Sequence, residues 1–65
     1  MEAAAIAHYM AGVNGWVSIK DICLNTGLSY KTVYYHLNDG RLFDAVLKDL
    51  SSEPQLYKLV NARGV

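Results

Sequence analysis

The chain has 65 residues, 52% of them hydrophobic, and its six basic and six acidic side chains cancel. This length allows one domain (residues 1–65) with one small core, near the lower limit for independent folding. The single cysteine excludes a scaffold held by internal disulfides, and no segment has the composition of a signal peptide or a membrane span. We therefore expect an intracellular, soluble protein without membrane contact, cytoplasmic or nucleoid-associated, in the host cell if it is viral.

The first residues are rich in alanine, and Ile6, Tyr9 and Met10 have the spacing of one helix face. They predict a packing helix over residues 3–11, ended by Gly12. After a loop, Trp16 and Val17 fit a very short strand.

The next segment predicts two helices, over residues 18–25 and 29–39, joined by a tight turn. Ser18, with Asp21 three residues later, fits a capping box, and Gly27 allows a positive φ in the turn. Ser29 fits a second N-cap. Such an arrangement is typical of the helix-turn-helix (residues 18–39), whose second helix enters the major groove of DNA.

The second of these helices should be amphipathic. Val33 and Leu37, four residues apart, give it a buried seam, and Gly40 should end it. Together with Ile6, Ile22, Leu28 and Leu59 they form the predicted core, which Trp16 should cover at one edge.

Two interpretations compete from residue 42 onward. The apolar residues of 42–50 fit a helical stripe, which propensity alone slightly favours. Two apolar runs also lie symmetrically about Ser51-Ser52-Glu53-Pro54, which fits the tip of a hairpin with strands 43–50 and 55–61.

The chain resembles winged helix-turn-helix proteins, in particular phage excisionases and the DNA-binding domains of MerR-type regulators. The resemblance covers residues 16–60 and rests on Cys23, Gly27, Leu28, Ser29, Thr32, Val33 and Leu37, then Gly40-Arg41-Leu42. It implies a mainly α fold with a small β-hairpin, in which three helices precede a wing (residues 43–61). It also favours the hairpin over the helix. Wings that contact DNA are usually basic, whereas this tip carries Glu53.

The predicted function is sequence-specific binding of double-stranded DNA, with the recognition helix (residues 29–39) in the major groove. Asn38 and Tyr35 should project away from the seam and read bases, while Lys20, Lys31 and Arg41 should mainly hold phosphate. The full set of candidate contacts is Ser18, Lys20, Ser29, Tyr30, Lys31, Thr32, Tyr34, Tyr35, Asn38, Arg41, Lys48 and Lys58.

No catalytic pattern is present, and His8, Cys23 and His36 lack metal-ligand spacing, so we expect neither an enzyme nor a cofactor or metal. A transcriptional regulator or an excisionase-like architectural factor of a phage or mobile element fits best. One recognition helix reads few base pairs, so a homodimer or tandem cooperative assembly on DNA is expected. Two alternatives stay open: a winged-helix protein–protein interaction module, and the DNA-binding domain of a larger protein such as a terminase small subunit.

Overall fold

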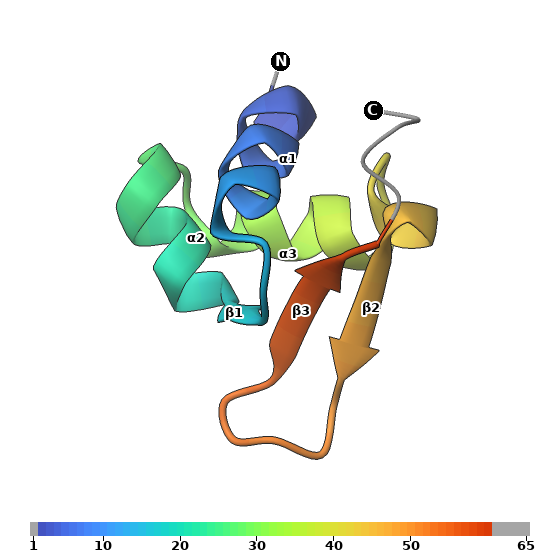
Figure 1. Cartoon of the computed structure of the whole chain (residues 1–65). Coiled ribbons are helices and arrows are strands. Elements are labelled where there is room, and N and C mark those ends of the chain that lie inside the picture. The colour runs from blue at the N-terminus through green and yellow to red at the C-terminus, as the bar shows by residue number, and fades with distance from the viewer. Residues whose placement is uncertain (1, 61–65) are drawn as a thin grey trace.

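The computed structural model describes residues 2–60 as three helices and a small antiparallel sheet, with the hairpin extending beyond the helices (Figure 1). The elements are α1 (Glu2–Val13), β1 (Val17–Ser18), α2 (Ile19–Thr26), α3 (Tyr30–Asn38), the 3-10 turn η1 (Phe43–Ala45), β2 (Val46–Asp49) and β3 (Leu56–Leu59). The strand order is β1-β3-β2. This is the predicted class, mainly α with a small hairpin. Within residues 2–60, every helix is too short or too polar to cross a membrane.

The first helix is longer than predicted. It passes through Gly12 and ends at Val13, after which Asn14 adopts the left-handed conformation with φ of 57°. The Asn14 backbone N–H still donates to the Met10 carbonyl, at 3.1 Å. Asparagine tolerates this conformation better than most residues do, so Asn14 and not Gly12 terminates the helix.

Both caps predicted for the helix-turn-helix are present. The Ser18 hydroxyl accepts from the Asp21 backbone N–H at 3.1 Å, and the Asp21 carboxylate accepts from the Ser18 N–H at 3.2 Å. Gly27 has φ of 78°, the left-handed conformation that ends α2, and Ser29 caps α3. These contacts are local in sequence, and they fix the angle at which α3 leaves the turn.

Position 40, just after α3, leaves too little space for a side chain. A Cβ built on it would lie 3.0 Å from the His36 Cα and 3.0 Å from a Tyr35 ring carbon. The Gly40 backbone N–H donates to the Tyr35 carbonyl at 2.8 Å. The chain therefore leaves α3 in close contact with the last helical turn, which a larger residue would obstruct.

The hairpin prediction is confirmed, and a helix over residues 42–50 is ruled out. Strands β2 and β3 pair antiparallel from Val46↔Leu59 to Asp49↔Leu56. The predicted first strand began too early, because Phe43–Ala45 form a 3-10 turn before β2 starts. The predicted second strand began one residue early, and its end at residue 61 lies outside the described residues. Pairing of β2 with the central strand β3 outweighs the slight helical preference of residues 42–50.

The core was predicted correctly at four of six positions. Ile6, Ile22, Val33 and Leu37 are fully buried, whereas Leu28 and Leu59 are only partly buried and pack against that core. Trp16 does not cover the core edge as expected, since it is 45% exposed. The prediction also omitted two buried helical residues, Met10 and Ile19, and buried residues of the strands and connections, namely Val17, Leu42, Val46 and Tyr57.

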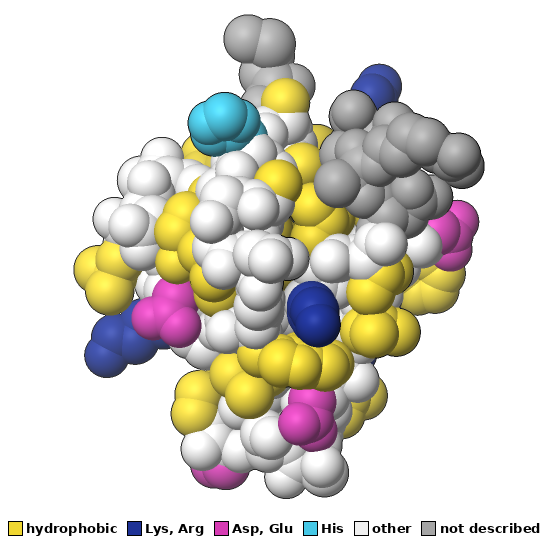
Figure 2. Space-filling view, in the orientation of Figure 1, with side chains coloured by type: hydrophobic (Ala, Val, Ile, Leu, Met, Phe, Trp, Pro, Cys, Tyr) yellow, Lys and Arg dark blue, Asp and Glu magenta, His cyan; other side chains and the backbone are white. Residues whose placement is uncertain are grey.

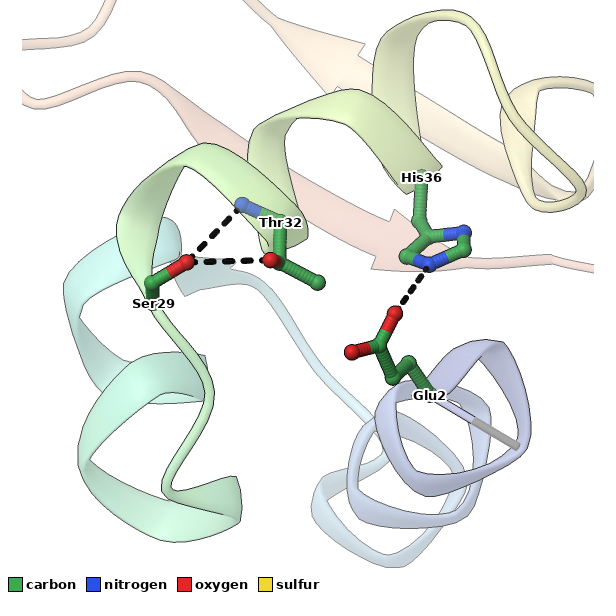
Figure 3. A network of polar contacts seen from close by, with 4 residues as sticks. All are labelled: Glu2, Ser29, Thr32 and His36. Carbon is green, nitrogen blue, oxygen red and sulfur yellow. Dashed lines mark hydrogen bonds and ion pairs between the residues drawn. The ribbon is translucent and has the colours of Figure 1, made fainter.

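A polar contact joins the start of α1 to α3. His36 Nε2 lies 3.4 Å from Glu2 Oε1, and the two side chains face each other across the gap between the helices (Figure 3). A single partly exposed polar contact of 3.4 Å contributes little, so burial of the apolar core carries most of the stability.

The wing turn is organised by Asp49. Its carboxylate accepts from the hydroxyls of Ser51 and Ser52, at 2.8 and 2.7 Å, and from the Ser51 N–H at 3.2 Å. Because these bonds favour the ionised form, with the Ser52 hydroxyl contributing most, they hold the pKa of Asp49 below its ordinary value.

A first prediction concerns the seam of α3. Val33→Ala and Leu37→Ala should each cost on the order of 2–4 kcal/mol, because both side chains are fully buried and each truncation leaves a cavity. Urea denaturation followed by circular dichroism measures the loss. Leu24→Ala is the matched control, because Leu24 is 73% exposed. Seam variants as stable as this control would contradict the assigned core.

A second prediction concerns Asp49 and pH. A lowered folded-state pKa means that ionised Asp49 stabilises the fold above its unfolded-state pKa, and that this contribution disappears as the pH falls through the folded-state value. Asp49→Asn should therefore melt below the parent near neutral pH, and the difference should close in acid. Thermal melts between about pH 7 and pH 3 test this. A difference that persists unchanged in acid would contradict it.

Candidate nucleic-acid interface

The exposed surface of α3, beside and opposite the Val33–Leu37 seam, is largely aromatic. Tyr30 and Tyr34 form one row, with ring centroids 6.2 Å apart in a stacked arrangement. Lys31 and Tyr35, also four residues apart, form the second row. Tyr30, Tyr34 and Tyr35 are 61, 47 and 52% exposed. We call these four residues the α3 face.

Asn38 does not belong to the α3 face. We predicted that its side chain points away from the seam, and this is wrong: the Asn38 amide donates to the Tyr57 hydroxyl at 3.1 Å and to the Tyr34 carbonyl at 3.1 Å. Tyr57 is fully buried in β3. Asn38 therefore joins the end of the helix to the sheet, and its amide is already occupied on the protein side.

The serine and threonine candidates take part in the helix N-caps. Ser18 is buried and accepts from Asp21, while the Ser29 hydroxyl contacts both the backbone N–H and the hydroxyl of Thr32, at 3.2 and 3.0 Å (Figure 3). Thr32 is half-buried. These side chains position the helix starts, so a phosphate placed there would mainly meet backbone N–H groups.

Lys20 lies beside the α3 face. An open groove of about 450 Å³ separates the start of α2 from the wing tip, and its lining includes Lys20, Tyr30, Glu53 and Gln55. The groove thus brings a predicted phosphate ligand close to the first tyrosine of α3. It also brings Glu53 to the same place, and a carboxylate there repels phosphate.

The remaining cations are dispersed. Arg41 is exposed just after α3. Lys48 lies over the Phe43 ring, with its ammonium 4.5 Å from the ring centroid. The register pairs Lys48 with Tyr57 and Lys58 with Leu47, so the two lysines lie on opposite faces of the hairpin.

The geometry thus gathers Lys20, Tyr30, Lys31, Tyr34 and Tyr35 into one region. The sequence did not reveal the groove or the presence of Glu53 in its lining, since both depend on where the wing tip lies relative to α2. Among residues 2–60, no group of three His, Cys, Asp or Glu side chains is placed to hold a metal ion.

Comparison of the chain with protein-family models, with curated proteins and with solved structures found no match.

A third prediction concerns the Asn38–Tyr57 contact. Tyr57→Phe removes the acceptor while keeping the ring, and should destabilise the fold by about 1 kcal/mol. Tyr9→Phe is the matched control, because the Tyr9 hydroxyl accepts from Asn25 at 3.3 Å in an exposed bond. Urea denaturation of both variants tests this, and equal losses would contradict a special role for the buried contact.

Proposed function

We propose that the protein binds double-stranded DNA in a sequence-specific manner and that the α3 face enters the major groove. The observation that carries the proposal is the contrast between the two sides of α3. Its seam residues, Val33 and Leu37, are fully buried, while Tyr35 on the opposite side and Tyr30 and Tyr34 beside the seam are 47–61% exposed.

The side chains on the α3 face suit a DNA groove. A lysine reaches guanine or phosphate, and a tyrosine donates its hydroxyl to phosphate while its ring contacts a thymine methyl. Tyr35 and Lys31 are the base-reading candidates, because Asn38 is held by Tyr57. Lys20 and Arg41, exposed on either side of α3 in the sequence, are the phosphate candidates.

A small transcriptional regulator or an excisionase-like architectural factor of a phage or mobile element would use such a surface, alone or as part of a larger protein. The zero net charge limits non-specific attraction to DNA. We therefore expect affinity to depend on base contacts and on two copies bound side by side or as a dimer.

A winged-helix module for protein interaction is the second candidate. It is favoured by Glu53, which lies in the same groove as Lys20 and opposes a phosphate there. A protein partner would use the tyrosines as apolar anchors with a polar end.

A fourth prediction separates these candidates. Tyr35→Ala should cost about 1–3 kcal/mol on a DNA duplex selected for binding and much less on a scrambled duplex. Lys20→Ala and Arg41→Ala should weaken both complexes alike and flatten their salt dependence. Fluorescence anisotropy at two salt concentrations measures these effects.

The control for Tyr35→Ala is Leu24→Ala, which also removes an exposed apolar side chain but lies near the far end of α2. It should leave DNA binding unchanged. If the parent shows no salt-dependent binding to any duplex in dilute buffer, the DNA proposal fails and the protein-interaction proposal replaces it.

A further inference from the structure

Within residues 2–60, the helices pack on one side of the sheet and leave the other side without a covering element. Antiparallel partners share a face and successive residues alternate, so Val46 and Tyr57 point inward while Leu47, Asp49, Leu56 and Lys58 point outward. Val46 and Tyr57 are buried, and Leu47 is 50% exposed. We call the four outward side chains the outer face.

Apolar residues continue this surface. Trp16 precedes the inward Val17 of β1, and Val60 follows β3 two residues after Lys58, so alternation places both beside the outer face. They are 45 and 49% exposed. Figure 2 views the sheet from this side and shows a basic side chain bordered by apolar ones. Contiguous exposed apolar surface of this kind marks an interaction site.

We propose that the outer face binds the outer face of a second copy of this chain. The four side chains occupy the corners of a rectangle, because Leu47 lies opposite Lys58 and Asp49 lies opposite Leu56. The two leucines therefore share one diagonal, and the two opposite charges share the other. This pattern is self-complementary.

The symmetry follows from the pattern. A two-fold axis along the leucine diagonal stacks Leu47 on Leu47 and Leu56 on Leu56, and it places each Lys58 over Asp49 of the second copy. A two-fold axis parallel to either edge of the rectangle would place a leucine of one copy against a charged side chain of the other. An axis along the Lys58–Asp49 diagonal would place Lys58 against Lys58 and Asp49 against Asp49. The strands of the two sheets then cross steeply, as in orthogonal sheet packing, and the interface is isologous.

A second copy fits better than an unrelated partner for two reasons. The chain has no net charge, so two copies do not repel each other as wholes. The outer face also lies on the opposite side of the sheet from Tyr57, the residue that contacts Asn38 of α3. Both copies therefore keep the α3 face free.

The contact between the two outer faces is small, so the dimer is weak and forms at high protein concentration. Formation of this dimer does not depend on DNA binding.

The test uses paired charge reversals. Lys58→Asp alone and Asp49→Lys alone each place like charges opposite one another in a dimer of identical copies, so each should weaken self-association by about tenfold or more. In a mixture of the two variants, every reversed side chain faces an opposite charge on the other chain. The mixture should therefore associate more tightly than either variant alone.

Sedimentation equilibrium up to about 1 mM protein measures these affinities. NMR spectra of each variant alone verify the fold, which matters because Asp49 also organises the wing turn. Leu47→Asp should abolish association, whereas Leu24→Asp, on an exposed leucine of α2, should not.

If the unmodified protein stays monomeric over this concentration range, the proposal is overturned, and the outer face would then bind a different protein. Association that survives Leu47→Asp also overturns it. If the mixed variants fail to associate although both are folded, the proposed pairing of Lys58 with Asp49 is wrong.

Discussion

The buried Tyr57 side chain is the constraint on which the arrangement of helices and wing depends. Its backbone lies in the central strand, opposite Val17 on one side and Lys48 on the other. The ring is fully buried, and its hydroxyl accepts from Asn38 at the end of α3. An unpaired buried hydroxyl is costly, so the Asn38 amide both satisfies Tyr57 and fixes the end of α3 relative to the sheet. One residue thus joins β1 and β2 through its backbone and the second helix of the helix-turn-helix through its side chain.

The α3 face offers DNA more aromatic surface than charge. Three tyrosines and one lysine project from the helix, and Lys20, which lines a groove with Tyr30, shares that groove with Glu53. Phosphate contacts carry much of the affinity of most DNA-binding proteins. A neutral protein of this size would compensate for weak phosphate binding by contacts to base edges and by binding as two copies. Both increase the affinity for the specific site more than they increase non-specific binding.

Features determined by local chemistry were predictable from the sequence, and features that depend on distant residues were not. The Ser18 capping box, the Gly27 turn and the Val33–Leu37 seam involve residues at most four apart. The hairpin needed the family resemblance, because the local pattern of residues 42–50 slightly favoured a helix. The direction of Asn38 was missed because its acceptor lies 19 residues away in β3. For the same reason, the groove lined by both Lys20 and Glu53 became visible only in three dimensions.

The most direct test of the central claim, that the α3 face is the DNA-binding surface, is an NMR titration of the ¹⁵N-labelled protein with a selected duplex. The account predicts that the backbone signals of residues 29–35 and of Lys20 shift most, while those of α1 and of the outer strand β2 stay in place. Shifts confined to the sheet, or no shifts with any duplex, would contradict the claim.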